Sequence, residues 1–500
     1  MNIKEAKQEL LQTIQVYTRK DSNGHYLLPS VRQRPILLIG PPGIGKTAIM
    51  EQAARECGIG LVAYTITHHT RQSAVGLPVI VKKKFQGKEY SVTEYTMSEI
   101  IASVYEKIEE TGCKEGILFI DEINCVSETL VPTMLQFLQN KTFGTHPVPS
   151  GWIIAAAGNP VEYNKSAREF DIVTLDRVKR IDIEPDLNVW KEYASAKGLH
   201  PSVLSYLSLK REHFYHIENT ADRICFVTAR GWEDLSAILY GYEDMHFAPD
   251  ENLIRQYLQD EEIARDFGAY YQLYAKYRQD YRIPEILSES VVESLCTLAA
   301  HAPTDERLTV AGLLLDGWNT LFLKFREEDQ FAVALQSVLR QARASLLEGN
   351  TLAAFTEQYR TSQKIRLENH LLDRMETDCT ERIARILEQS LSLTQQERIS
   401  APEEVIAILR HALEENVKIR QDTVNRTSLA LHLGFSFAES AFGDGPEILF
   451  LISDLSHNAN AVSFISHFGC EEYFRFNKKL KFQEERQNLL QEIDSVIRTV

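Results

Sequence analysis

Residues 40–47 read Gly40-Pro41-Pro42-Gly43-Ile44-Gly45-Lys46-Thr47, and this stretch decides the fold. An apolar run at residues 35–39 precedes it, and a helix-forming run at residues 48–54 follows it. Strand, glycine-rich loop and helix in this order are the context that a P-loop, or Walker A motif, requires. Its glycines let backbone N–H groups converge on phosphate oxygens. We therefore predict a nucleotide site in which Lys46 reaches the β- and γ-phosphates and the Thr47 hydroxyl binds Mg²⁺.

The composition is that of a globular protein with several domains. The chain has 500 residues, of which 44% are hydrophobic and 25% are charged, and this length predicts about two to four domains. A formal net charge of −16 disfavours a nucleic-acid or membrane-surface binder. Seven cysteines without a CxxC pair indicate reduced thiols and a cytoplasmic protein. We find no signal-peptide core and no apolar run long enough for a membrane span.

A second apolar run ends in two carboxylates. Residues 116–120 predict a strand that is buried on both faces, as in a parallel sheet, and Asp121 and Glu122 follow at its C-terminal end. Asp121 would bind Mg²⁺ directly or through water, and Glu122 would orient and polarise the attacking water. The alternative is a strand that simply ends in a charged turn, which the P-loop upstream disfavours.

A third buried strand is predicted at residues 152–158, and it ends in Asn159 and Pro160. An amide at this position could donate a hydrogen bond to the γ-phosphate or hold the attacking water. An ordinary Asn-Pro turn is the alternative. A fourth strand is predicted near residues 180–185, and beyond it the apolar pattern becomes helical.

Five motifs in order resemble the AAA+ ATPases: GPPGIGKT, LFIDEIN, AAAGNP, LDR and ARGWEDLS. Within that superfamily, residues 1–245 are most similar to the MoxR-like branch, to which magnesium-chelatase-type ATPases are related. The resemblance implies ATP hydrolysis with Mg²⁺. It also implies that Asn159 is the sensor-1 residue, that Arg230 is the sensor-2 arginine, and that Arg177 is an arginine finger that reaches the neighbouring subunit's site.

An arginine supplied by a neighbour also has a physical rationale. Negative charge spreads as the γ-phosphate leaves, so a cation placed there stabilises the transition state and makes hydrolysis depend on assembly. Arg180 and Arg168 are nearby rivals for this role. Motif position favours Arg177, although Val178 stands where this branch usually has an aromatic residue.

The expected fold class is an α/β P-loop AAA+ core, with a parallel sheet flanked by helices, a small α-helical lid and a mostly α-helical C-terminal region. We place the core at residues 1–185, the lid at 186–248 and the C-terminal region at 249–500. The sequence leaves open whether a break near residue 425 divides the C-terminal region into two units. Four tyrosines spaced along one helix face predict a core-facing stripe or, alternatively, a docking surface: Tyr270, Tyr274, Tyr277 and Tyr281.

The resemblance implies a homo-oligomeric ring, with six subunits as the family expectation, that remodels or matures a protein client in a chaperone-like way. A client with a von Willebrand factor A domain is typical of MoxR-like systems. Two alternatives stay open. A nucleic-acid-directed motor is disfavoured by the acidic composition, and a slow nucleotide-gated assembly scaffold is disfavoured by the Asp121–Glu122 pair and Asn159.

Overall fold

The computed structural model describes residues 1–68, 74, 76–126, 128, 130–143, 146–164, 166–219, 224–288, 293–368, 372, 374–399 and 401–479. Its internal contacts divide the chain into two compact units. Unit 1 comprises Met1–Val189 together with Thr228–Arg230. Unit 2 comprises Trp190–Val227 and Gly231–Val500.

Unit 1 is built on a five-stranded parallel sheet with the strand order β2-β5-β8-β1-β9. The strands are β1 (Ile36–Ile39), β2 (Gly60–Thr65), β5 (Gly116–Asp121), β8 (Trp152–Gly158) and β9 (Lys179–Asp182). Because the sheet is parallel, the C-terminal ends of β1, β5 and β8 meet at one edge. That edge receives the P-loop, the acidic pair and Asn159.

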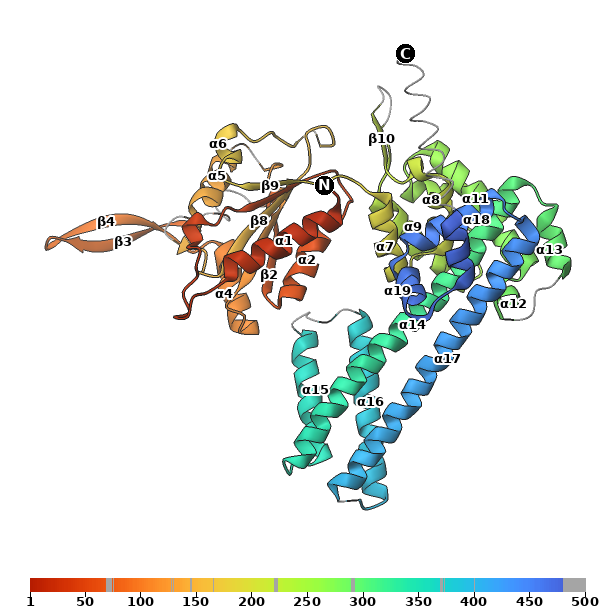
Figure 1. The fold of residues 1–500 in the computed structure, drawn as a ribbon. Coiled ribbons are helices and arrows are strands. Elements are labelled where there is room, and N and C mark those ends of the chain that lie inside the picture. Colours follow the sequence, from red (N-terminus) through yellow and green to blue (C-terminus); the bar gives the residue numbers. More distant parts are fainter. Residues whose placement is uncertain are drawn as a thin grey trace, which may run out of the picture. The chain divides into compact units, whose positions relative to one another are not determined.

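Helices cover both faces of this sheet, which is why its central strands are apolar along their whole length. One face packs against α4 (Glu99–Thr111) and α5 (Val131–Asn140), and α1 (Ile3–Thr18) and α2 (Lys46–Cys57) lie together on the other (Figure 1). A short helix, α6 (Ile172–Leu175), precedes β9. The predicted α/β core is therefore confirmed.

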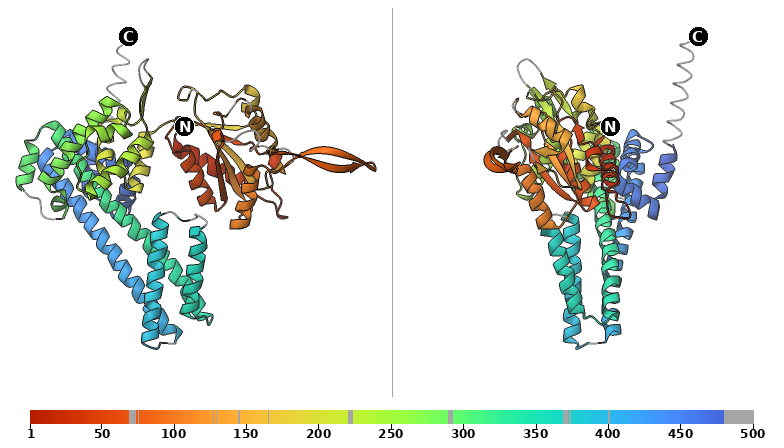
Figure 2. Two further views of the ribbon diagram at one scale, coloured as in Figure 1. Left: turned by 180° about the vertical axis from the view of Figure 1, so that it is seen from behind. Right: turned by 90° about the vertical axis from the view of Figure 1, so that its left-hand side faces the viewer.

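Two antiparallel ribbons are inserted into unit 1. The longer one, β3 (Pro78–Phe85) and β4 (Lys88–Tyr95), extends away from the sheet (Figure 2). The shorter one, β6 (Thr142–Phe143) and β7 (His146–Pro147), was not predicted, because two-residue strands carry no periodicity to detect.

Unit 2 is mostly helical, as predicted. The segment expected to form the lid contains α7 (Leu187–Lys197), α8 (Pro201–Leu209) and α9 (Ala229–Asp244). Unit 2 includes all of α8 and most of α7 and α9, whose first residues belong to unit 1. It also contains an unpredicted antiparallel strand pair, β10 (His216–Asn219) and β11 (Ile224–Val227). The helices that follow are α10 (Glu251–Tyr257), α11 (Glu261–Tyr281), α12 (Ile283–Ser288), α13 (Glu293–Ala300), α14 (Thr304–Leu347), α15 (Leu352–Glu368), α16 (Arg374–Gln396), α17 (Pro402–Phe442), α18 (Pro446–His457) and α19 (Ala459–Phe468).

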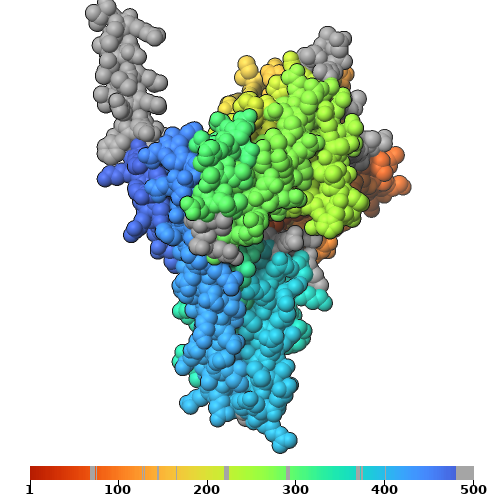
Figure 3. Space-filling model, turned by 90° about the vertical axis from the view of Figure 1, so that its right-hand side faces the viewer, coloured from red at the N-terminus to blue at the C-terminus, as the bar shows by residue number. Residues whose placement is uncertain are grey.

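A helical arm projects within unit 2, formed by α15, α16 and the adjoining parts of α14 and α17 (Figure 3). It has a hydrophobic cluster of its own, to which Phe331, Leu335 and Leu387 belong. Helix α17 runs without interruption through residue 425, near which the sequence left a possible break open. The three-part division of the chain stays a prediction.

Helices α8 and α9 share their core with α11 and α14 of the C-terminal half. The Ser205 hydroxyl of α8 lies 2.6 Å from the Tyr270 hydroxyl of α11. A Cβ on Gly312 of α14 would lie 2.1 Å from Ser205 Oγ, so a larger residue there would have to displace this hydroxyl. Trp232 of α9 stacks edge-on against Phe267 of α11, with ring centroids 5.3 Å apart. Three tyrosines of the stripe on α11 are also buried, namely Tyr274, Tyr277 and Tyr281, and the half-buried Tyr270 packs against the same cluster, which confirms the core-facing interpretation.

Among the described residues, no single helix is long and apolar enough to cross a membrane. Helices α18 and α19 reach that length and apolarity only as a pair, and they are bent by 91° relative to each other.

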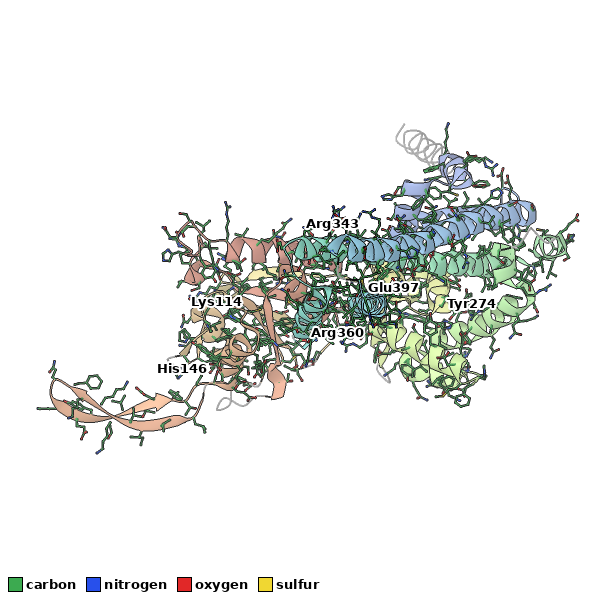
Figure 4. The ribbon with its side chains drawn as sticks, turned by 90° about the horizontal axis from the view of Figure 1, so that it is seen from below. Lys114, His146, Tyr274, Arg343, Arg360 and Glu397 are labelled. Carbon is green, nitrogen blue, oxygen red and sulfur yellow. The ribbon has the colours of Figure 1, made fainter. Side chains whose placement is uncertain are left out.

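A carboxyl group on α14 is buried beside α11 and α18. Asp316 accepts a hydrogen bond of 2.7 Å from the Tyr274 hydroxyl, and Figure 4 marks Tyr274 on α11. Burial raises the pKa of Asp316 to about 7, and the nearby Asp454 carboxylate raises it further. The hydrogen bond from Tyr274 and the charges of Arg278 and Lys191 oppose that increase in pKa. Lys191 itself is paired with Asp454.

We expect Asp316→Asn to flatten the pH dependence of stability. A carboxyl whose folded pKa lies above its unfolded value contributes stability below about pH 4 that is lost as the pH rises through 7. The asparagine keeps an acceptor for Tyr274 and has no charge to bury. The free energy of unfolding of the variant relative to the parent should therefore be larger at pH 8 than at pH 5, by on the order of 2–4 kcal/mol. Urea unfolding at both pH values measures this, with the exposed Asp280→Asn on α11 as the control. Equal pH slopes in parent and Asp316→Asn would contradict the prediction.

Candidate ATP site

The P-loop connects β1 to α2 with a backbone that needs its glycines. Gly43 and Gly45 have φ values of 73° and 91°, a region that other residues rarely adopt. A side chain at Gly40 would lie 2.7 Å from the carbonyl oxygen of Ile183. Helix α2 then begins at Lys46, directly after Gly45. The loop is thus curled at the N-terminus of a helix, the geometry that binds phosphate groups.

Lys46 lies at the centre of the site. Its Nζ donates hydrogen bonds of 2.8 Å each to the carbonyl oxygens of Gly40 and Pro41 and to Oδ1 of Asn159. Burial lowers the pKa of this amine to about 8, and Arg230 lowers it further, while Asp121 and Glu122 raise it. The amine is therefore close to four of the predicted site residues besides the loop itself.

Thr47 and Asp121 form a hydrogen-bonded pair, with 2.9 Å between Thr47 Oγ1 and Asp121 Oδ2. A hydroxyl and a carboxylate are the hard oxygen ligands that Mg²⁺ prefers, usually together with phosphate oxygens. Thr47 and Asp121 would hold such an ion, which would supply positive charge to neutralise the phosphates. In the described part of the chain, no group of three or more His, Cys, Asp and Glu side chains could hold a metal.

Glu122 sits at a turn with unusual backbone geometry. Its φ is 56°, a conformation that costs a non-glycine residue on the order of 1–3 kcal/mol and is typical of functional sites. The turn is held by hydrogen bonds of 2.9 Å from Cys125 N to Glu122 O and from Ile123 N to Ala157 O. The carboxylate is half-buried, at the same sheet edge as Asn159.

One residue of this region had no role in the sequence prediction. Asn124 lies within the motif LFIDEIN, and its Nδ2 donates a 2.7 Å hydrogen bond to the backbone oxygen of Asn159. The side chain is only 5% exposed. A polar residue two positions after an acidic pair at a buried strand end was the available signal, but its partner is remote in sequence and periodicity does not reveal it.

The start of α9 lies against the P-loop. A Cβ on Gly43 would lie 3.0 Å from Thr228 Oγ1 and 3.4 Å from the Cβ of Arg230. Arg230 was predicted from its motif, whereas Thr228 was missed. The structure therefore brings Arg230 to the same site as Lys46.

Arg177 is not brought to the P-loop. It is exposed at the turn after α6. Its charge acts on Asp171, whose pKa is lowered first by hydrogen bonds from Thr174 and then by Arg177. Its guanidinium makes no hydrogen bond or ion pair with any residue that the structure describes. Its two rivals are paired: Arg180 bonds Asp182 at 2.8 Å, and Arg168 bonds Glu128 at 2.7 Å.

Comparison with known proteins identifies the fold of this region. Residues 36–175 match the model of the AAA family, the ATPase family associated with various cellular activities. No match was found among curated proteins. The matched range runs from the start of β1 to the end of α6, and it contains the P-loop, the acidic pair and Asn159. Unit 1 of this chain therefore contains an AAA ATPase domain.

Proposed function

We propose that this chain is a MoxR-like AAA+ ATPase that assembles into a ring, hydrolyses ATP at the interfaces between subunits and uses that energy to remodel a protein client. The observation that carries the proposal is the separation of two sets of residues. Lys46, Thr47, Asp121 and Asn159 converge by hydrogen bonds, whereas Arg177 is exposed outside that set. Such a site is completed by a second copy of the chain.

The surface beside Arg177 supports assembly. Ile172 and Val173 on α6 are 85% and 57% exposed, which is unusual for adjacent branched apolar side chains. Burying them against a neighbour would remove apolar area from water and position the guanidinium at the same time. A cyclic arrangement follows from such a head-to-tail contact if the rotation closes. Six subunits is the expectation from the resemblance.

Within the site, each residue has a chemical task. Glu122 would accept a proton from the attacking water, and Asn159 would hold that water or the γ-phosphate. Lys46 would exchange its bonds to Gly40, Pro41 and Asn159 for bonds to phosphate oxygens. Arg177 of the next subunit and Arg230 would stabilise the charge that develops on the γ-phosphate.

Helix α9 offers a route from the site to a client. Its first residues belong to unit 1 and contact the P-loop, whereas Trp232 is fully buried in unit 2. A nucleotide that binds one orientation of α9 more tightly would shift the equilibrium between orientations of this helix, and the difference in affinity sets the size of that shift. We infer that unit 2 acts on a cytoplasmic protein client, for which a von Willebrand factor A domain is the leading candidate.

ATPase activity per subunit should rise with protein concentration, because a lone subunit lacks the arginine of its neighbour. The measurement is ATPase turnover across a dilution series with Mg²⁺ and ATP, alongside light scattering for the assembled mass. Replacing Ile172 with Asp should shift the rise to higher concentration. A monomer that hydrolyses ATP at the full rate would rule out the ring.

A further inference from the structure

We propose that Asn124 is a positioning residue that fixes the sensor Asn159 relative to the turn carrying Glu122. The inference rests on the proposed ATPase function and adds a residue to its machinery. Asn124 would not touch ATP or the attacking water. It would act through the two residues that do.

The side-chain amide of Asn124 lies between two other backbone segments and donates hydrogen bonds to both. Its Nδ2 lies 2.7 Å from the carbonyl oxygen of Asn159 and 3.4 Å from that of Arg168. Its own backbone oxygen accepts a 3.0 Å hydrogen bond from Arg168 N. Asn159 is consequently held twice, by Asn124 at its backbone and by Lys46 at its side chain.

Asn124 also belongs to the turn that carries the general base. Glu122 precedes it by two positions, and the Cys125 N to Glu122 O bond closes the turn around it. The link from Asn124 to Asn159 therefore joins the ends of β5 and β8 beyond the last paired residues of the sheet. Glu122 and Asn159 must both be placed correctly around one γ-phosphate and its attacking water. A misplacement of about 1 Å can lower the rate about 100-fold.

Gly158 leaves the space that this amide occupies. A Cβ there would lie 2.5 Å from Asn124 Oδ1 and 2.9 Å from its Cγ, so a side chain at residue 158 must displace the amide. Gly158→Ala therefore tests the same contact from the opposite side, with Asn124 itself unchanged.

Two substitutions of Asn124 test the hydrogen bond in different ways, because its side chain is the donor. Asn124 donates to a carbonyl oxygen, which a carboxylate cannot do. Asn124→Asp keeps the size of the side chain but places an anion against the Asn159 carbonyl. Asn124→Ala removes the contact altogether.

The experiment measures kcat, KM and ATP affinity for the full-length chain with Mg²⁺. We expect Asn124→Ala, Asn124→Asp and Gly158→Ala each to lower kcat about 10- to 100-fold while the Kd for a fluorescent ATP analogue stays within about 3-fold. The control is Gln33→Ala, because Gln33 is a buried amide of the same unit that donates to the carbonyls of Tyr17 and Leu28 at 3.0 Å each. It should lose stability without losing kcat.

Parental kcat in both Asn124 variants would overturn the inference, as would a Kd that rises in proportion to the loss of kcat. A fall in kcat for Gln33→Ala equal to that of Asn124→Ala would show that general destabilisation is the cause. If Asn124→Ala does not fold, the isosteric Asn124→Asp decides. A parent chain that hydrolyses no ATP would overturn the proposed function first, and the inference with it.

Discussion

Glu122→Gln should bind ATP, assemble like the parent and lose about 10²- to 10⁴-fold of its ATP turnover, the contribution expected of a general base. The amide has the size of the carboxylate but cannot accept the proton of the attacking water. The left-handed backbone at this position is available to both residues at a similar cost, so the turn should survive the substitution. Turnover, ATP affinity and assembled mass are measured on one preparation.

The matched control is Glu51→Gln, an exposed glutamate on α2, the helix that leaves the P-loop. It removes the same charge close to the same loop and should keep parental turnover. Turnover like the parent's in Glu122→Gln would show that another group activates the water. Because the variant should stay in the ATP-bound state, it is also the form with which to search for the proposed client, and a partner retained with ATP but released with ADP is the expected outcome.

Arg177→Ala should lose about 10³- to 10⁵-fold in turnover, as other NTPases do without an arginine finger, and mixing should restore part of it. In a mixture with Lys46→Ala subunits, some interfaces combine an intact P-loop from one subunit with an intact Arg177 from the next. For equal amounts that assemble at random, up to about a quarter of the interfaces are complete. Turnover in the mixture, compared with the two variants alone, is the measurement.

Arg180→Ala is the control for this experiment, because Arg180 is already bonded to Asp182 and should be nearly silent. The reverse pattern, with loss in Arg180→Ala and none in Arg177→Ala, would assign the finger to Arg180. A mixture no more active than its components would show that Arg177 acts within its own subunit.

The site could be anticipated from sequence because parallel strands bring their C-terminal ends together. Residues 40–47, Asp121 and Asn159 each follow an apolar run, so their meeting at one edge follows from the sheet alone. Asn124 and Thr228 could not be found this way. Their side chains lie against backbone that is remote in sequence, at Asn159 and Gly43 respectively, and no spacing encodes these contacts.

The C-terminal half shows the same limit more broadly. Helical periodicity predicted that the tyrosines of α11 face a core, but it did not indicate which helices supply the other side. The fit of Gly312 against Ser205 depends on an absent side chain, and the strand pair β10 and β11 interrupts a segment expected to be helical. Such features depend on packing between secondary-structure elements, whereas a periodic sequence pattern describes only a single element.

The close packing of α8 on α14 has a mechanical consequence. A helix rises about 1.5 Å per residue, so roughly 50 Å separate Gly312, beside the lid, from Leu347 at the far end of α14. If the helix turns as a stiff rod, a rotation of about 5° at Gly312 displaces Leu347 by about 4 Å. The arm would thus turn a small rotation beside Gly312 into a displacement of about 4 Å at its far end.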